Sequence, residues 1–378
     1  MPPEPPPGVV WQDVFPPPPR SLLTGVPAIV GRAGAGPADA VRLTLWPQFV
    51  AAFGPSTPGF LADAVHGFFA NDGVLCYVVR LDERLPAEAA LAAALAQIED
   101  LGDVDLLCAP DSAAAGAQQA MLADHCRRLG DRFAILDGAP GADTMAIRAQ
   151  ADRLTGPAGA FAALYHPWLW TLGATGRPHY VPPSGHVAGV YSRSDRRVGV
   201  HKAPANEVVE DVLDLASAVT AAEAGELNGA GVDCLRAYPG RGIRVSGART
   251  LAAAPEWRDV GTRRLVGSIV RWIERFMTGL VHEPNDVRLW VRIMRELTAY
   301  LDGLFQRGAL RGRTAAEAFY VKCDSETNPP EAIEAGMVVT HVGVAPAVPA
   351  EFITVRLIHG PSGVTADTAQ TARQEAGQ

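Results

Sequence analysis

The sequence comprises 378 residues, of which 48% are hydrophobic and 20% are charged, and its formal net charge is −8. This length exceeds one ordinary hydrophobic core and predicts about two domains, and the composition is that of a globular protein. The acidic net charge argues against nucleic acid as the main partner.

The sequence carries no recognisable targeting or membrane signal. Residues 1–19 have neither the basic region nor the apolar core of a signal peptide, so we expect no export by that route. No apolar stretch approaches 18 residues, which argues against membrane insertion. Five widely separated cysteines without CxxC spacing favour reduced, buried thiols over disulfides or a zinc site; they are Cys76, Cys108, Cys126, Cys234 and Cys323.

The charge is distributed unevenly along the chain. Residues 236–325 contain 16 Lys and Arg against 9 Asp and Glu, a local balance of +7 (16 − 9), which leaves −15 for the remainder. Of the 33 basic residues, all except Lys202 and Lys322 are arginine. Arginine suits planar pairing with carboxylates at interfaces, but a GC-rich genome gives the same bias.

Residues 1–24 are predicted to form an N-terminal arm. Proline runs on both sides of residues 8–15 exclude helix and central strand there. The segment between them has β-type residues without a local partner, so we expect it to pair with another subunit. A disordered tail is the alternative. The arm residues assigned to this contact are Val9, Val10, Trp11, Val14 and Phe15.

Residues 26–81 show the pattern of strands alternating with helices. Buried strands are predicted over residues 26–31 and 74–81, and helices over residues 46–53 and 61–69. The same alternation continues to about residue 167. There we expect helices at 87–101, 114–129 and 144–154, and strands at 105–109, 132–137 and 160–165. Short apolar strands between amphipathic helices indicate a parallel sheet, assigned to a small inserted α/β domain.

The rest of the chain is predicted to be α+β. Residues 187–192 and 234–238 are expected to be strands and residues 206–219 a helix. Two long helices follow, with apolar faces that run from Leu265 to Leu280 and from Leu289 to Leu304. Closing strands are predicted at 318–323, 338–344 and 351–359. In the last strand, Phe352, Ile353, Val355 and Leu357 are assigned to an inter-subunit arm, and the polar tail beyond residue 360 is expected to be disordered.

Motifs of catalysis and cofactor binding are weak. The stretch 239–244 lacks the spacing of a phosphate-binding loop and is better explained as a turn that needs positive φ. Asp111 and Ser112 follow a predicted strand where α/β enzymes place catalytic residues, but helix capping explains them better. Residues 283–286 fit the start of a helix. We therefore expect no catalytic residue, cofactor or metal ligand.

Arginines form two rows on the long helices. Arg264, Arg271 and Arg275 fall on one side of the first helix. On the second, Arg288, Arg292 and Arg295 follow i, i+4, i+7 spacing. Such rows suit a partner with an acidic surface, although solvated arginine faces are common.

Several segments resemble the tail sheath family of contractile phage tails and extracellular contractile injection systems. Their order along residues 7–357 carries the resemblance, and the segments are 7–11, 25–31, 46–54, 64–73, 76–80, 182–191, 202–206, 235–243, 247–251, 283–286 and 343–352. The resemblance implies a structural, non-enzymatic subunit that polymerises helically around an inner tube and contracts. It also implies a core domain built from both ends of the chain, with arms that link neighbouring subunits.

On this resemblance the chain divides into an arm (1–24), two core parts (25–82 and 181–350), an inserted outer α/β domain (83–180), an arm strand (351–360) and a tail (361–378). The implied partners are other copies of the chain, the inner tube protein, and baseplate and terminal cap proteins. The two arginine rows become candidates for contact with the tube. The implied location is the cytoplasm of the producing bacterium, in an assembled particle released by lysis, or a phage virion. The alternatives are another tail or baseplate component, or an α/β hydrolase.

Overall fold

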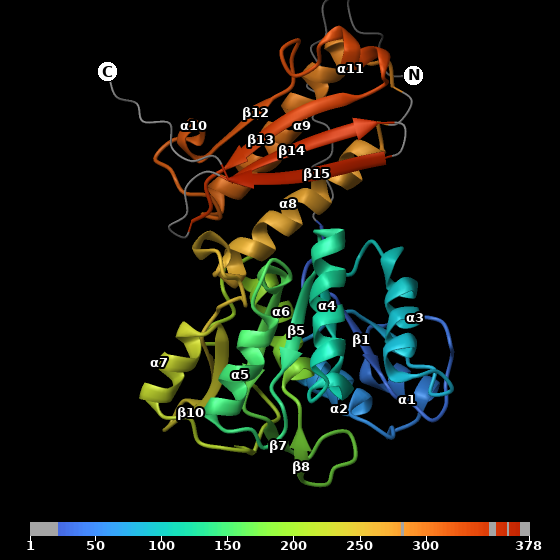
Figure 1. Cartoon of the computed structure of the whole chain (residues 1–378), viewed down its shortest axis with the longest axis vertical. Coiled ribbons are helices and arrows are strands. Elements are labelled where there is room, and N and C mark those ends of the chain that lie inside the picture. The colour runs from blue at the N-terminus through green and yellow to red at the C-terminus, as the bar shows by residue number, and fades with distance from the viewer. Residues whose placement is uncertain (1–21, 281–282, 348–352, 361–362, 371–378) are drawn as a thin grey trace, which may run out of the picture.

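The computed structural model describes residues 22–280, 283–347, 353–360 and 363–370, which form two lobes joined through one long helix (Figure 1). The larger lobe is built around a mostly parallel sheet with helices on both faces. The smaller lobe packs two long helices against an antiparallel sheet. The predicted combination of α/β and α+β architecture is confirmed.

An eight-stranded sheet forms the centre of the larger lobe, the α/β lobe. Across the sheet the strands are β11 (Gly242–Ser246), β10 (Val232–Tyr238), β6 (Ala162–His166), β5 (Phe133–Asp137), β4 (Leu106–Cys108), β1 (Pro27–Gly31), β3 (Cys76–Arg80) and β2 (Val41–Leu43). The six strands from β10 to β3 are parallel, and only the outer strands β11 and β2 are antiparallel to their neighbours. The central strands are buried on both faces, which explains their continuous apolar sequences.

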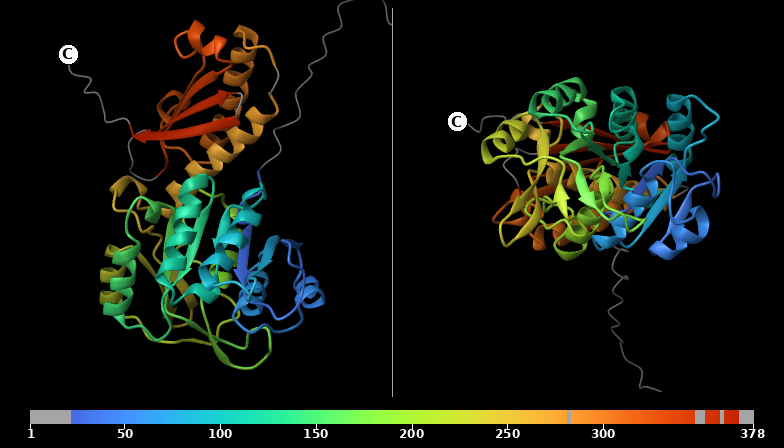
Figure 2. Two further views of the ribbon diagram at one scale, coloured as in Figure 1. Left: turned by 45° about the vertical axis from the view of Figure 1, so that its right-hand side comes forward. Right: turned by 90° about the horizontal axis from the view of Figure 1, so that it is seen from below.

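Helices cover both faces of this sheet, as the view from below also shows (Figure 2). One layer consists of α3 (Ala87–Glu99), α4 (Gly116–Leu129), α5 (Thr144–Leu154) and α7 (Ala221–Gly229), which share a hydrophobic cluster with the sheet. The opposite face is covered by α1 (Trp46–Phe53), α2 (Leu61–Ala70) and α6 (Ser184–Arg197). Short 3₁₀ turns complete the lobe at η1 (Pro110–Ser112), η2 (Ala158–Phe161) and η3 (Pro255–Trp257).

The predicted strand at residues 187–192 is wrong, because these residues lie in α6. A short apolar run cannot distinguish a buried strand from a helix that is buried on all sides, and α6 is buried from Ser184 to Asp195. Two glycines allow α2 to approach closely: a Cβ at Gly185 would lie 2.3 Å from the Ala64 carbonyl oxygen, and one at Gly189 would lie 2.5 Å from that of Phe68.

The predicted helix at residues 206–219 is also wrong. Asn206 and Asp211 adopt left-handed backbone angles, with φ of 62° and 61°, which interrupt any helix. The segment instead follows the outer edge of β11, where Val209 N donates to Ile243 O at 2.8 Å. A small sheet of β8 (His179–Val181), β7 (Leu169–Thr171) and β9 (Asp214–Leu215) lies at the end of the lobe far from the smaller lobe (Figure 1).

The smaller lobe contains both long helices, α8 (Val260–Thr278) and α9 (Val287–Gln306), as predicted. Their apolar faces pack together and against a sheet with the order β12 (Phe319–Lys322), β13 (Val338–Val344), β14 (Ile353–Gly360) and β15 (Gly363–Gln370). Two short helices, α10 (Ala315–Ala318) and α11 (Pro330–Glu334), flank the strands. The aromatic rings of Trp272 and Tyr300 stack at 3.9 Å between the helices.

Two of the expected chain divisions need correction. Residues 25–82 and 83–180 do not form separate sheets, because β1 pairs with β3 on one side and β4 on the other. Likewise β6 pairs with β10, so the expected boundary after residue 180 falls inside one sheet. The tail predicted to be disordered from 361 to 378 contains β15, whose backbone pairs with β14; residues 371–378 lie outside the described part.

Candidate assembly surfaces

The root of the predicted N-terminal arm is fixed where the two lobes meet. The Asp105 carboxylate accepts hydrogen bonds from Gly25 N at 3.0 Å and Val26 N at 2.7 Å. Gly25 has a φ of +74°, and a Cβ there would lie 2.5 Å from the Ser192 Cα, so the chain turns closely against α6. The arm residues Val9, Val10, Trp11, Val14 and Phe15 lie outside the described residues, and their pairing remains a prediction.

Arg264 does not belong to an exposed row, contrary to the prediction. Its guanidinium is buried between two carboxylates, at 2.6 Å from Asp195 and 3.1 Å from Asp105, and lies 4.7 Å above the Tyr191 ring. Burial alone would lower the pKa of Arg264, but the carboxylates of Asp195 and Asp105 raise it above its usual value. Arg264 therefore stays charged and ties α8 to the α/β lobe.

The other two arginines of this row extend the same connection. Arg271 is buried, and its Nη2 donates to Leu23 O at 2.6 Å. Arg275 is exposed and pairs with Asp103 at 3.2 Å. Helical spacing does place the three arginines on one side of α8, but that side faces the α/β lobe. The prediction of a solvent-facing row is therefore wrong for Arg264 and Arg271.

The arginines of α9 form an exposed row. Arg288, Arg292 and Arg295 are all exposed, opposite the buried face of Leu289, Ile293 and the leucines that follow. Arg292 pairs with Glu283 at 3.2 Å and Arg295 with Glu296 at 2.8 Å, both on the surface. Beside them, Val287 and Val291 are 64% and 53% exposed. This combination of cationic and apolar side chains suits a partner surface.

The segment predicted as a C-terminal arm pairs within its own chain. The backbone of β14 pairs with β13 on one side and β15 on the other, and Leu357 is fully buried in the hydrophobic core of the smaller lobe. Ile353 is paired with Val344, and Val355 with Val342; Phe352 lies outside the described residues. The intermolecular assignment of this strand is therefore corrected, and the outer strands of the sheet are β12 and β15.

The residues considered for catalysis form hydrogen bonds with the backbone of their own chain. Asp111 accepts hydrogen bonds from Arg32 N at 2.7 Å and Phe60 N at 2.9 Å, and Ser112 Oγ donates to Ala109 O at 2.6 Å. Asp137, which the sequence did not indicate, accepts from Ser184 N at 2.7 Å and so fixes the start of α6. Burial raises the pKa of Asp137 to about 7.

Two motifs have the structural roles that were predicted. Gly240 and Gly242 have φ of 68° and 75°, which confirms a turn in the stretch 239–244. Residues 283–286 open α9, where Asp286 Oδ1 accepts from Arg288 N at 2.8 Å. Asp286 is thus the capping residue of α9. Within the described residues no group of three His, Cys, Asp or Glu side chains could hold a metal ion, and no helix is long and apolar enough to cross a membrane.

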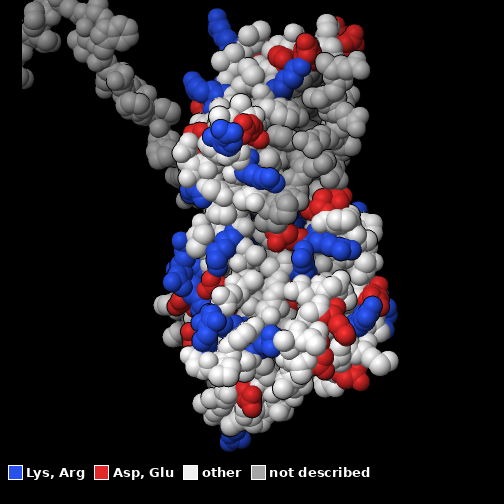
Figure 3. Space-filling model, turned by 90° about the vertical axis from the view of Figure 1, so that its left-hand side faces the viewer, with Lys and Arg blue, Asp and Glu red and all other residues white. Residues whose placement is uncertain are grey.

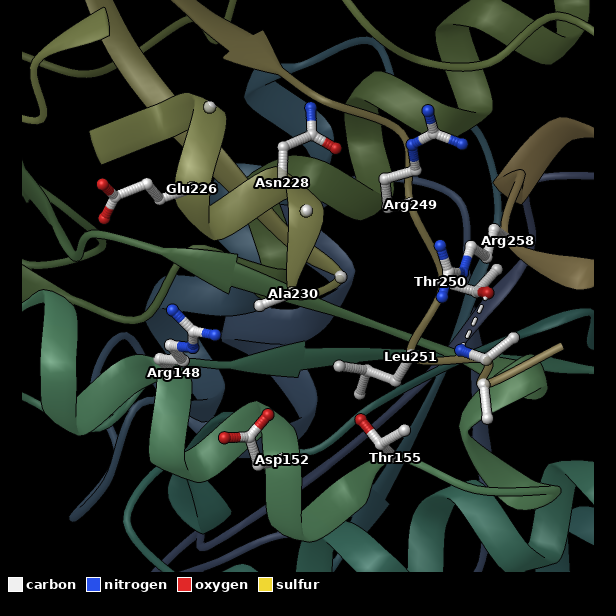
Figure 4. Close-up of a pocket in the computed structure, with 15 residues that line it drawn as sticks. Arg148, Asp152, Thr155, Glu226, Asn228, Ala230, Arg249, Thr250, Leu251 and Arg258 are labelled. Atoms are coloured by element: carbon white, nitrogen blue, oxygen red, sulfur yellow. Dashed lines mark hydrogen bonds between the residues drawn. The ribbon is translucent and has the colours of Figure 1, made fainter. Parts of the chain in front are cut away.

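A polar cavity of about 720 Å³ opens beside α5 and α7 (Figure 4). Arg148 and Asp152 come from α5, and Arg249 and Arg258 from the segment between β11 and α8. Thr250 Oγ1 in the wall accepts from Ala252 N at 3.2 Å. The cavity is open to solvent and lined by exposed charged side chains, so its geometry suits contact with a macromolecular surface.

Two family profiles match consecutive parts of the chain. The phage tail sheath protein central domain matches residues 87–251, and the phage tail sheath C-terminal domain matches residues 252–358. A comparison with curated protein sequences finds no match.

Solved structures extend these matches over nearly the whole chain. A chain of the anti-feeding prophage baseplate is 30% identical over 92% of this chain and 97% of its own length, with a TM-score of 0.74. A chain of the contracted PVC sheath complex, an extracellular contractile injection system, is 28% identical over 98% of both chains, with a TM-score of 0.75. The sheath tail protein from Desulfitobacterium hafniense is 12% identical over 93% of this chain and all of its own, with a TM-score of 0.66, and shares the fold.

Proposed function

This chain belongs to the phage tail sheath family and is a structural sheath subunit, and we propose that it polymerises helically around an inner tube and contracts to drive that tube into a target. The observation that carries the proposal is the match over 98% of both chains with a subunit of a contracted sheath complex. Heterologous contacts that do not close on themselves generate such a helix. We assign no catalytic residue, cofactor or metal.

The exposed arginine row of α9 is our candidate for contact with the inner tube. Exposed ion pairs contribute only about 0.2–1 kcal/mol each, so one subunit would bind the tube weakly. Because every subunit of the lattice repeats this contact, the sheath as a whole would bind the tube firmly. Because each single contact is weak, it can break during contraction. Arg275, the one exposed member of the α8 row, pairs with Asp103 of the same chain and is a weaker candidate.

We propose that the N-terminal arm links subunits by adding a strand to a neighbour's sheet. The smaller lobe offers β15, an outer strand of its sheet, as our candidate to pair with the added strand. The arm root, the segment from Leu22 to Val26, is hydrogen-bonded to Asp105 and Arg271. It would transmit a force exerted by a neighbouring subunit to both lobes. Baseplate and terminal cap proteins would complete the particle, assembled in the bacterial cytoplasm and released by lysis, or forming part of a virion.

A second candidate function is that of a baseplate component. Matching chains occur in anti-feeding prophage baseplate structures as well as in sheath structures. A baseplate component forms a single ring or plate, whereas a sheath subunit repeats along the tube.

Electron microscopy of the expressed full chain, alone and with its tube protein, tests the proposal. We expect striated tubes in both samples, and longer, narrower particles filled by the inner tube in the second. Rings or plates without tubes would favour the baseplate role. A chain that stays monomeric at high concentration in both samples would contradict the sheath proposal.

A further inference from the structure

A stretch rich in arginine lies at one end of the α/β lobe. Residues 236–258 run from the last three residues of β10 through β11 to the segment before α8, and they contain five arginines and one acidic residue, Glu256. Asp233 and Asp259 flank this stretch; Asp233 is buried and Asp259 caps α8. Three of these arginines, Arg241, Arg249 and Arg258, are exposed, and none of the three forms an ion pair within the described part of the chain. Figure 3 shows several basic side chains on this side of the α/β lobe, with acidic side chains among and beside them. We call residues 236–258 the basic edge.

An acidic stretch lies toward the opposite end of the same lobe, where the outer strand β2 also carries the exposed Arg42. Residues 82–103, which follow β3 and form α3, contain six acidic residues and one arginine, Arg84. Arg84 is neutralised by Asp82, whereas Glu83, Glu88 and Asp100 are exposed and have no ion pair among the described residues. We call residues 82–103 the acidic edge. Figure 1 shows the two edges on opposite sides of the lobe, with α7 beside one and α3 beside the other.

The charges lie at corresponding levels of the two edges. Strands β3 and β10 and the four strands between them, β1, β4, β5 and β6, are all parallel. Their carboxyl ends therefore lie along the same side of the sheet. Glu83 stands three residues after the end of β3, and Arg241 stands three residues after the end of β10. Both side chains therefore mark the carboxyl side of the sheet.

The amino side of the sheet repeats this correspondence. Asp100 ends α3 shortly before β4 begins. At the basic edge, Leu251 N donates to Ala162 O at the beginning of β6, which places neighbouring Arg249 at the same side of the sheet. Copies of the lobe placed side by side with their sheets in the same orientation thus bring Arg241 toward Glu83 and Arg249 toward Asp100.

The basic edge also borders a surface cavity. Arg249 and Arg258 line the cavity of about 720 Å³, together with Arg148 and the apolar Leu251 and Ala252. Two carboxylates, Asp152 and Glu226, lie in the same lining, so the site is predominantly but not wholly cationic. On the acidic edge, Leu85, two residues after Glu83, is 41% exposed, so this edge also presents an apolar side chain.

From these observations we infer that the α/β lobes of neighbouring subunits contact each other head to tail, with the basic edge of one copy against the acidic edge of the next. The partner is a second copy of this chain, because both charge patterns are present on every subunit. The contact is heterologous, so it repeats without closing and is compatible with a helical lattice. The inference rests on the proposed sheath function.

Charge reversal on one edge at a time gives a direct test. One variant carries Arg241→Glu, Arg249→Glu and Arg258→Glu, which makes both of its edges acidic. The other carries Glu83→Arg, Glu88→Arg and Asp100→Arg, which makes both edges basic. Each variant alone should polymerise only at a critical concentration raised roughly tenfold or more, because like charges then face each other. An equimolar mixture should polymerise as an alternating copolymer at close to the wild-type concentration.

A control matched to the basic-edge variant reverses three exposed arginines elsewhere, Arg177→Glu, Arg311→Glu and Arg313→Glu, with the same change in net charge as that variant, and should assemble like the wild type. Circular dichroism verifies that all variants fold. If the wild type polymerises while each edge variant alone does so equally well, or the mixture gains nothing over its components, the lateral contact is wrong and the sheath function stands. If the wild type forms no polymer under any of these conditions, both proposals fail.

Discussion

The two long helices carry the same sequence signal and use it in opposite ways. Each has three arginines on one side at helical spacing, yet the α8 row is directed into its own subunit and the α9 row into solvent. Arg264 and Arg271 are buried against the α/β lobe and the arm root, whereas Arg288, Arg292 and Arg295 are exposed. Spacing fixes the side of a helix on which charges lie, and the packing of the helix decides what that side faces.

This difference predicts that substitutions in the two rows lower folding stability by very different amounts, most of all at Arg264. Replacing Arg264 by Met leaves the buried carboxylates of Asp195 and Asp105 without their positively charged partner. Breaking a buried ion pair in this way lowers the free energy of unfolding by about 3–5 kcal/mol. Urea unfolding of the purified chain measures the effect. The same substitution at exposed Arg275 on the same helix should cost about 0.2–1 kcal/mol.

If the Arg264→Met chain does not fold at all, Arg264→Lys supplies the comparison. The lysine keeps the positive charge but cannot form the bidentate hydrogen bonds that Arg264 donates to Asp195. That variant should be folded and less stable than the wild type. Equal stability of the Arg264 and Arg275 variants would refute the buried ion cluster.

A smaller effect is expected at Arg271, which distinguishes the arm root from the rest of the junction. The change Arg271→Met leaves the Leu23 carbonyl without its donor at 2.6 Å and should cost about 1–3 kcal/mol. Hydrogen exchange should also become faster at the amides of Gly25 and Val26, while the central strand β5 stays protected. Unchanged exchange at these amides would show that Arg271 does not hold the arm root.

The N-terminal arm should affect assembly without affecting folding. Deleting residues 1–20 leaves the arm root from Leu22 onward and every described contact intact, so we expect no change in the cooperative unfolding transition. The truncated chain should remain monomeric in sedimentation experiments, whereas the full chain polymerises. Normal tubes from the truncated chain would contradict the linking role of the arm.

Substitutions on α9 are also expected to affect assembly rather than folding, and only assembly with the tube should respond. The triple variant Arg288→Glu, Arg292→Glu, Arg295→Glu should unfold like the wild type within about 0.5 kcal/mol per site. It should form contracted tubes but few extended particles on the inner tube. High salt should weaken the wild-type contact in the same way, because exposed charges are screened over about 8–10 Å at 0.1–0.15 M ionic strength.

The matched control for α9 is Arg311→Glu with Arg313→Glu, two exposed arginines of the same lobe outside the α9 row. Extended particles formed equally by the control and by the triple variant would mean that α9 carries an ordinary solvated face. Loss of extended particles in the triple variant alone would assign the tube contact to this helix.

Features that depend on neighbouring residues could be predicted from the sequence alone. The repeat of Leu289, Ile293 and Leu297 every four residues defines one apolar face and therefore a helix, whatever the rest of the chain does. Short apolar strands alternating with helices likewise predict a parallel sheet, and the ordered motifs along the chain were sufficient to suggest the family.

Which elements share a core and which charges are exposed depends on contacts between segments that are distant in sequence. The partners of Arg264 lie 69 and 159 residues away in the chain, so no local pattern could indicate that it is buried. Residues 187–192 form a helix because glycines allow close packing against α2, and the polar segment beyond residue 360 becomes a strand because β14 offers an edge. In each case the deciding free energy comes from burial and hydrogen bonds between segments distant in sequence, which local propensity does not encode.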